Sequence, residues 1–358
     1  MALPTLKIRN KHRDEIIAVD LGGRHTKAVH LQNRGGQFHL LAYTIQDSPS
    51  EQTSFSVDVL AEHLKSVSRA LGDRTKTVTI ALGATEAVVR RAEMPPMPVG
   101  DMRQLLKFNS KNYLQQDLPD HIFDCSLVLP RRAADGTTPE TPRIAPGSKQ
   151  KILVGGAKRQ LVEDVATAVK QAGLFPAEIT PGLVGPLNAF EISEPEVFGG
   201  QTVALVDLGF RNTTISMLQH GELVMHRVVN IGGDRFTNGL AEALNISYAE
   251  AEGIKVGMAS EVQSNLEPLV TSLGRELRAF IDFFEHQQDV PVSQVFLSGG
   301  CARGELIVQA LQLELLVPCK VWNPARGLQS GLATEQATEL ESLSPQFAVA
   351  LGAGISAL

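Results

Sequence analysis

The sequence predicts an α/β protein built from two duplicated domains, with a small α+β subdomain inserted into the first. Three observations support this fold class. A short motif occurs twice, at 20–26 and 207–213; strand-like and helix-like segments surround each copy; and a proline-rich break at 94–98 sets a compact unit apart from the first domain. Strands followed by a helix and a further strand are typical of α/β domains with a mixed sheet.

The repeated motif is Asp-Leu-Gly-x-Arg-x-Thr, which begins at Asp20 in the first copy and at Asp207 in the second. Each copy follows a short apolar run and precedes an alternating segment that ends near a glycine turn. This pattern predicts a strand, a tight turn and a second strand. The alternative is two unrelated hairpins in which Asp-x-Gly is ordinary turn chemistry. The position-for-position match of the two copies favours a duplication.

A glycine turn of this kind is suited to phosphate. Glycine allows positive φ and a close approach of the backbone to a ligand, and successive N–H groups in a turn converge on an anion. A carboxylate at the mouth of the turn repels phosphate unless a cation lies between them. Asp20 and Asp207 therefore predict a Mg²⁺ ion, held through water.

The composition is that of an ordinary globular protein, with 43% hydrophobic and 20% charged residues among 358, enough for two or more domains. The net charge of −6 argues against nucleic acid as the main partner. The three cysteines, Cys125, Cys301 and Cys319, form no CxxC pair, which favours a reducing compartment and no zinc site. No apolar run reaches the roughly 18 residues that span a bilayer.

The first part of the first domain is predicted at 14–94, after a flexible basic tail at 1–13. Within it, the alternation of apolar and polar residues predicts three strands over 14–46. Apolar residues at helical spacing predict a helix over 58–71, and a strand follows at 76–82.

The inserted subdomain is predicted at 95–177, because prolines as dense as those at 94–98 stop both helices and strands. The expected elements are a helix at 99–116, strands at 122–129 and 151–155, and a helix at 159–172. The segment 130–150 has almost no residues to bury and is predicted to be a mobile loop.

The second domain is predicted at 199–236 and 290–340, with a helical subdomain at 237–289. Three strands over 203–230 surround the second motif. Ser247 and Glu250 form a capping-box pattern, which predicts that a helix begins there.

Two segments, 178–198 and 341–358, are predicted as connecting helices that return to the first domain. The second is apolar and rich in small residues, which favours burial. A membrane-binding tail is the alternative for this end. The chain carries no Lys or Arg after Arg326, so attraction to anionic lipid is missing.

In this order and spacing, the motifs resemble those of the actin-like (ribonuclease H-like) ATPase superfamily. The stretch Asp20–Gly22 with Lys27 resembles its first phosphate motif, Asp207–Gly209 with Thr213 its second, and Leu297–Gly300 with Arg303 its adenosine motif. The resemblance covers nearly the whole chain.

Within the superfamily the chain is most similar to the PilM and FtsA branch. The inserted unit lies where that branch has its extra subdomain. The stretches 231–237 and 246–255 resemble the segment that closes over the nucleotide there.

The resemblance implies ATP and Mg²⁺ between the two halves, with Asp20 and Asp207 at the metal. The implied nucleotide-binding residues are Gly22, Gly23, Arg24, His25, Thr26, Lys27, Gly209, Phe210, Arg211, Asn212, Thr213, Gly232, Gly233, Glu252, Lys255, Ser298, Gly299, Gly300 and Arg303.

For three of these residues, a purely structural role is the alternative to nucleotide binding. Glu252 and Lys255 lie three residues apart and would also suit an exposed helix pair. Lys27 would also suit the solvent face of a strand.

The sequence contains few candidates for a residue that activates water for ATP hydrolysis. An attacking water needs a carboxylate or amide within hydrogen-bond reach. Glu178 is the only acidic residue in the connecting stretch before Pro181, and its alternative role is structural. The segment 188–190, Asn-Ala-Phe, has no obvious catalytic side chain. We therefore expect weak ATPase activity at most, with nucleotide acting mainly as a conformational ligand.

The resemblance implies a cytoplasmic scaffold of type IV pilus or related secretion assembly, located at the inner membrane through a protein partner. That partner would be the N-terminal cytoplasmic tail of a PilN-like single-span protein, lying between the first domain and the inserted subdomain. Other pilus assembly components are further expected partners.

Two alternatives remain open from the sequence. A sugar-kinase-like phosphotransferase would need a catalytic Asp beside a polar pocket, and 95–177 shows no such motif. An FtsA-like cell-division protein would need a basic amphipathic C-terminal helix, which the sequence lacks.

Overall fold

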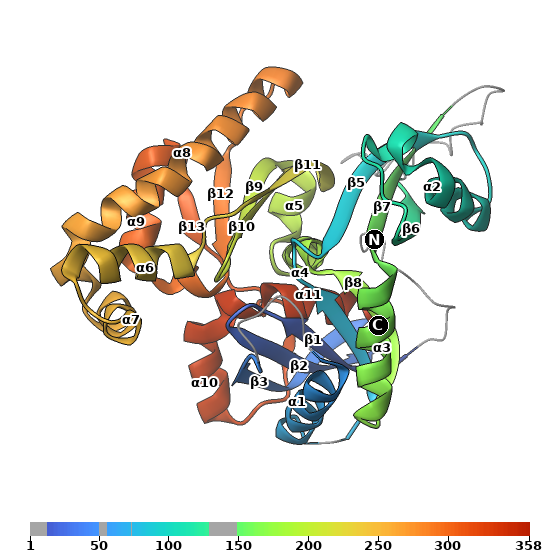
Figure 1. The fold of residues 1–358 in the computed structure, drawn as a ribbon, viewed down its shortest axis with the longest axis horizontal. Coiled ribbons are helices and arrows are strands. Elements are labelled where there is room, and N and C mark those ends of the chain that lie inside the picture. The colour runs from blue at the N-terminus through green and yellow to red at the C-terminus, as the bar shows by residue number, and fades with distance from the viewer. Residues whose placement is uncertain (1–12, 50–55, 73, 129–148) are drawn as a thin grey trace.

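The computed structural model describes residues 13–49, 56–72, 74–128 and 149–358. The tail predicted at 1–13 and the loop predicted at 130–150 lie almost wholly outside the described residues. The described chain forms three sheets. Figure 1 shows the two larger sheets on either side of helices α4 (Gly185–Ser193) and α11 (Ala348–Ala357).

The first sheet has the strand order β14-β3-β2-β1-β4-β8. Strands β1 to β3 are antiparallel neighbours, whereas β4 runs parallel to β1 and β8 runs parallel to β4. The strands are β1 (Glu15–Leu21), β2 (His25–Arg34), β3 (Gln37–Asp47), β4 (Thr77–Leu82), β8 (Phe175–Pro181) and β14 (Gln329–Ser330).

Helices α1 (Val57–Ala70) and α3 (Arg159–Gln171) pack against one face of this sheet. Helix α1 begins where the Ser56 hydroxyl accepts a hydrogen bond from the Val59 N–H, which satisfies one free donor of its first turn. Its buried residues recur at helical spacing, so one stripe faces the sheet: Leu60, Leu64 and Val67.

The second sheet has the order β11-β10-β9-β12-β13 and repeats the first, with the same antiparallel and parallel pairings as β3-β2-β1-β4-β8. The duplication predicted from the motif is therefore present in the strand order. The strands are β9 (Thr202–Leu208), β10 (Thr213–Gln219), β11 (Glu222–Val229), β12 (Gln294–Ser298) and β13 (Cys319–Val321).

Helices α6 (Gly233–Leu244), α7 (Tyr248–Gly257), α8 (Gln263–Gln288) and α9 (Glu305–Leu315) share one core with this second sheet. Helix α7 begins with the predicted capping box, in which Ser247 and Glu250 each bond the other's backbone N–H. Helix α8 buries a stripe that includes Leu266, Val270, Leu273, Leu277, Ile281 and Phe284. Short 3-10 turns lie at Ala259–Val262 and Gly300–Arg303.

The third sheet belongs to the inserted unit and has the order β5-β7-β6, with α2 (Val99–Leu114) packed on it. Its strands are β5 (Ala87–Met94), β6 (His121–Leu127) and β7 (Gln150–Lys158). The inserted unit differs in two ways from the predicted range 95–177. The charged strand β5 lies before residue 95 but pairs with β7. Helix α3 lies within that range but packs against α1, because its apolar stripe completes the core of the first half.

The two connecting segments cross between the halves. After β8, the chain continues as a turn at Gly182–Val184, α4 and α5 (Pro195–Gly200). At the C-terminal end it forms α10 (Thr334–Leu343), a turn at Ser344–Phe347 and α11. Helices α4 and α11 touch so closely that a Cβ at Gly352 would collide with the carbonyl of Gly185. Among the described residues, no helix is both long and apolar enough to cross a membrane.

Candidate functional site

The two copies of the repeated motif face one cavity. Its volume is 1300 Å³, and its lining includes Asp20 and the β1–β2 turn of the first sheet together with Asp207 and the β9–β10 turn of the second. The turns also meet each other. A Cβ at Gly23 would lie 3.5 Å from the Phe210 ring and 3.6 Å from the Arg211 side chain. The duplication thus places two glycine turns across a cleft between the halves.

Both turns need glycine for the same steric reason. A Cβ at Gly22 would lie 2.5 Å from the carbonyl oxygen of His25, and one at Gly209 would lie 2.6 Å from that of Asn212. These distances are shorter than any normal contact, so a larger residue would force the backbone to move. In the second turn the Gly209 N–H also donates to the Asn212 carbonyl at 3.0 Å. Each turn is therefore held in a tight shape open to a ligand.

The two carboxylates at the turns have different neighbours. Lys27 Nζ lies 3.3 Å from Asp20 Oδ2, whereas Asp207 Oδ1 accepts a hydrogen bond from the Ser298 hydroxyl at 2.8 Å. Burial, together with the charge of Asp20, raises the pKa of Asp207 to about 6, although the Ser298 hydrogen bond and the charge of Lys27 act in the opposite direction. A cation between the two carboxylates would relieve this repulsion, so the donor set fits a Mg²⁺ ion. In the described part of the chain, no group of three or more His, Cys, Asp and Glu could hold a metal ion, so the remaining ligands would be water or phosphate.

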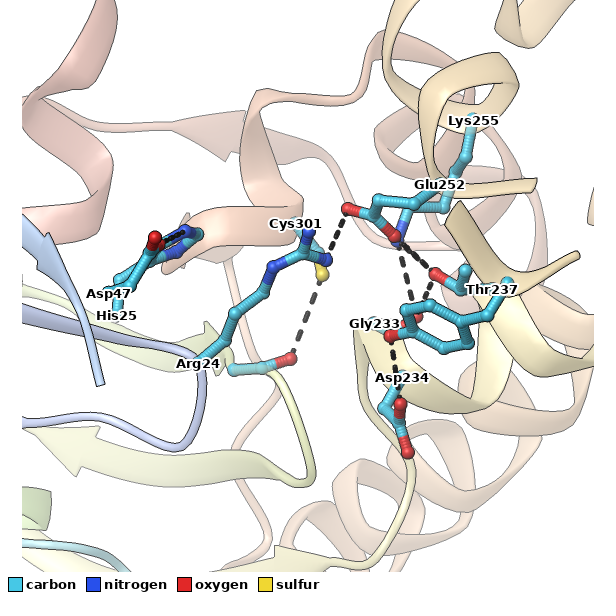
Figure 2. Close-up of polar contacts among 11 residues, drawn as sticks. Arg24, His25, Asp47, Gly233, Asp234, Thr237, Glu252, Lys255 and Cys301 are labelled. Atoms are coloured by element: carbon cyan, nitrogen blue, oxygen red, sulfur yellow. Dashed lines mark hydrogen bonds and ion pairs between the residues drawn. The ribbon is translucent and has the colours of Figure 1, made fainter. Parts of the chain in front are cut away.

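An ion pair crosses the cleft at a second point. Figure 2 shows the guanidinium of Arg24, on the first turn, pointing to Glu252 of α7, and their Nη1 and Oε1 atoms are 2.8 Å apart. The other oxygen of Glu252 accepts from Lys255 Nζ at 2.7 Å and from the Thr237 hydroxyl at 2.5 Å. Although burial opposes its charged form, these bonds lower the pKa of Glu252. Glu252 is therefore a fixed carboxylate acceptor facing the cleft.

Glycines line the same end of the cavity beside Glu252. Gly299 adopts φ +91°, and a Cβ there would collide with the carbonyl of Leu208. A Cβ at Gly232 would collide with the carbonyl of Phe210. Lys255 Nζ donates to the Gly233 carbonyl at 3.2 Å. Backbone and long side chains thus bound a slot of the kind that accepts a flat ring and a sugar.

Most predicted site residues line the cavity: Asp20, Gly22, Gly23, Arg24, His25, Lys27, Asp207, Gly209, Phe210, Arg211, Asn212, Gly233, Glu252, Lys255, Gly299, Gly300 and Arg303. Four others lie behind this lining. Thr26 and Thr213 are buried, where Thr26 Oγ1 pairs with His63 at 2.8 Å and Thr213 donates to the Ile231 carbonyl at 2.8 Å. Ser298 and Gly232 support Asp207 and the second turn from behind.

Glu178 is not part of the cavity lining. It is buried in β8, 3% exposed, so it is not placed to meet an attacking water in the cleft. The lining also includes residues that the motifs did not predict, among them Glu86 and Cys301. Glu86 accepts from the Gly83 N–H at 3.1 Å, and burial raises the pKa of its carboxyl. Glu86 follows a glycine turn directly after β4, and the parallel pairing of β4 with the motif strand β1 brings it to the cavity. The glycine turn is visible in the sequence, but the pairing is not.

The cavity extends away from the turns towards the inserted unit. Leu60 of α1, Val165 of α3 and Leu118 supply apolar lining there, and His121, Lys158 and Asp164 supply polar lining. We call the part of the cavity that these six residues surround the lateral groove. The Nδ1 atom of His121 is buried and has no hydrogen-bond partner among the described residues. An apolar floor with a polar rim is typical of a site for an extended peptide.

Comparisons with known proteins agree with this architecture. The cell division protein FtsA of Bacillus subtilis (strain 168) is 33% identical over 103 residues, which are 29% of this chain and 22% of that protein. A solved PilM–PilN type IV pilus biogenesis complex matches with a TM-score of 0.79 at 21% identity, over 96% of this chain and 98% of the other. The ethanolamine utilization protein EutJ of Carboxydothermus hydrogenoformans matches with a TM-score of 0.55 at 15% identity, over 98% and 92%.

The structural likenesses confirm the predicted actin-like fold. The family model described as type IV pilus assembly protein PilM matches residues 18–357, nearly the whole chain. The chain therefore belongs to the PilM family of type IV pilus assembly proteins.

Proposed function

We propose that this protein is an ATP-binding cytoplasmic scaffold of type IV pilus or related secretion assembly, in which a nucleotide bridges the two halves. The observation that carries the proposal is the shared cavity: two copies of one motif, on two separate sheets, present their glycine turns to the same space. The backbone N–H groups of both turns would bind the phosphates, with Lys27 as a mobile positive charge.

Asp20 and Asp207 would hold Mg²⁺ through water. The ion would neutralise charge on the phosphates and on the two carboxylates, which face the same cavity. At the other end, Glu252 would accept hydrogen bonds from the ribose hydroxyls. The glycines at 232–233 and 299–300, with Arg303, would bound the adenine.

The site is better suited to binding than to rapid hydrolysis. Glu178 lies outside the cavity, and the remaining acidic candidate, Glu86, is a single carboxyl whose pKa burial raises. The nucleotide would act mainly by setting the angle between the halves, because it contacts both of them and they meet at the packed helices α4 and α11.

For the partner, we propose the N-terminal cytoplasmic tail of a PilN-like inner-membrane protein, bound in the lateral groove. The likeness to a PilM–PilN complex supports this choice. The groove has an apolar floor and a buried His121 nitrogen that has no partner within the described ranges and that a peptide group could satisfy. Such a partner would keep the protein at the cytoplasmic face of the inner membrane.

A nucleotide titration tests the first half of this proposal. We expect labelled ATP to bind in Mg²⁺ and to bind about tenfold more weakly in EDTA, because the carboxylates then repel the phosphates. Asp207→Ala should remove most of this Mg²⁺ dependence, whereas the matched control Asp234→Ala, on α6 outside the cavity lining, should keep it. Absence of ATP binding by the folded wild type would contradict the proposal, and so would rapid phosphorylation of a sugar.

A peptide titration tests the second half. A fluorescent peptide copying the tail of a PilN-like protein should bind, and Leu161→Gln should weaken it about tenfold, since an apolar contact would then face an amide. Leu161 lines the lateral part of the cavity on α3. The control is Thr167→Gln, an exposed change on the same helix outside the cavity lining. Equal binding by the two variants would place the peptide elsewhere.

A further inference from the structure

A polar contact joins the inserted unit to the second half through residues that are not part of the cavity lining. Arg91 of β5 forms an ion pair with Glu222 of β11 and also donates to the carbonyls of Leu223 at 3.2 Å and Val224 at 3.5 Å. A guanidinium carries five N–H donors in a fixed fork, so it can hold a carboxylate and two carbonyls together. We call this set of contacts the Arg91 strap.

The backbone of β11 is shaped to receive Arg91. Strand β11 is the edge of the second sheet. Its register against β10 shifts at Met217 and Leu218, which pair with Met225 and Leu223. Val224, between these two, is therefore opposite no residue of β10. Such a bulge leaves backbone groups outside the ladder, and an unpaired edge carbonyl needs another donor. Arg91 supplies it from a different part of the molecule.

The neighbouring residue reinforces the strap. Arg90 Nη1 donates to its own strand at Val89 and lies 3.3 Å from Nε2 of His226 on β11. Consecutive side chains of a strand leave opposite faces, so both faces of β5 are engaged with β11. Burial, assisted by Arg90, lowers the pKa of His226 to about 4, so the ring is neutral and its Nε2 can accept this hydrogen bond at neutral pH.

The strap also connects to the lateral groove. Strand β5 pairs with β7, and Arg91 is opposite Leu153. Strand β7 ends at Lys158, which is opposite His121 of β6, and both of these residues belong to the groove. A displacement of β11 would therefore pass through β5 and β7 to one wall of the groove, whereas α1 and α3 form the other wall.

The strap and the cross-cleft ion pair lie at different ends of the second half. In Figure 1, β11 lies beside β5 at the end nearest the inserted unit, and α7, which carries Glu252, lies at the far left of the same half. A rotation of the second half about α4 and α11 that closes the cleft at α7 would pull on β5 through Arg91.

We propose that the Arg91 strap couples the nucleotide cleft to the lateral groove, so that nucleotide occupancy changes the affinity of the groove for its peptide. This inference rests on the proposed function, since it assigns a regulatory link between the two sites proposed there. By linkage the effect is reciprocal, so the peptide changes nucleotide affinity by the same factor.

A binding cycle tests the coupling. The peptide described above is titrated with wild-type protein, without nucleotide and with saturating Mg²⁺ and a non-hydrolysable ATP analogue. We expect the peptide dissociation constant to change about fivefold or more, the lower end of typical coupling. In Arg91→Ala the change should fall below about twofold, while each ligand alone binds within about twofold of wild type. Arg91→Lys, which keeps the charge but loses the fork, should be intermediate.

The matched control is Arg227→Ala. Arg227 is also on β11, but its ion pair with Glu276 at 2.7 Å stays within the second half, so coupling should remain at the wild-type value. Glu222→Ala removes the carboxylate that Arg91 binds and replaces Arg91→Ala if that variant unfolds. Full coupling in a folded strap variant, or a wild type that binds both ligands without coupling, would overturn the inference. A wild type that fails to bind nucleotide or peptide would instead refute the proposed function.

Discussion

The two motif turns share a backbone and differ in the side chains that face them. In the first half, Asp20 is opposite Lys27 on β2 and Ala81 on β4. In the second half, Asp207 is opposite Thr214 on β10 and Ser298 on β12. The first carboxylate therefore has a cation beside it, and the second has hydroxyls. The duplication has kept the same tight glycine turn in both halves and divided the charges between them.

The same comparison extends to the turns that follow the parallel strands. Glu86 comes five residues after Ala81, and Arg303 comes five residues after Ser298, and both line the cavity. Corresponding positions thus carry opposite charges. Under the proposed function, the carboxyl in the first half would orient water or a ligand of the metal ion, and the guanidinium in the second half would contact the nucleotide.

The largest expected effect tests whether the shared backbone matters more than the differing side chains. Gly209→Ala places a methyl group against the carbonyl of Asn212, and Gly22→Ala does the same against His25. We expect both to weaken ATP binding about a hundredfold, since backbone strain of roughly 1–3 kcal/mol adds to a displaced turn. The measurement is an ATP titration of each variant, with thermal unfolding as a check on the fold.

Gly23→Ala is the matched control for these variants. A Cβ there meets the Phe210 and Arg211 side chains at 3.5–3.6 Å, an ordinary contact, so binding should stay within about twofold of wild type. If Gly22→Ala behaved like Gly23→Ala while Gly209→Ala lost binding, the two turns would not be equivalent. The phosphates would then rest on the second half alone.

A smaller effect is expected from the opposite charges at Glu86 and Arg303. Glu86→Gln should leave ATP affinity nearly unchanged and lower any residual hydrolysis about tenfold, since glutamine can still orient a water but cannot take its proton. Arg303→Gln should do the reverse, with weaker ATP binding and little change in the rate per bound nucleotide. Phosphate release in single turnover, with ATP bound to saturation, separates the two outcomes. Unchanged hydrolysis per bound nucleotide in Glu86→Gln would show that Glu86 has only a structural role.

The fold was largely predictable from the sequence because its main signal is a duplication. The motif at Asp20 and Asp207 marks equivalent strands, and a β-strand, glycine turn and β-strand keep their shape in both halves. Strand β5 was missed because Arg90, Arg91 and Glu93 make it as polar as a loop, and its pairing with β7 is not visible in a local pattern.

The glycine turns of the site were predictable from the sequence, because the local backbone forms them. The side chains that meet from distant segments were less predictable. The turn glycines line the cavity as expected, but Thr26 and Thr213, which share their motif, face inward and satisfy buried partners. Glu178 is the only acidic residue in the connecting stretch before Pro181, but β8 holds it in the interior. Glu86 reaches the cavity only because β4 lies parallel to β1, a pairing that no single stretch of sequence specifies.

The smallest expected effect concerns the arginines of the two turns, which occupy the same motif position. Arg24 crosses the cleft to Glu252, and its guanidinium also lies 5.7 Å from the centre of the Phe210 ring, whereas Arg211 lines the cavity from the second turn. Without nucleotide, Arg24→Ser should therefore favour the open cleft and Arg211→Ser should not. A partly exposed ion pair contributes about 0.2–1 kcal/mol, so the ratio of closed to open molecules should fall by no more than about fivefold. Single-molecule energy transfer between labels on α1 and α7 measures that ratio directly. Adding about 0.5 M salt should reduce the difference between wild type and Arg24→Ser, because salt screens the ion pair. Equal opening in both serine variants would mean that the connecting helices, rather than the Arg24 pair, set the angle between the halves.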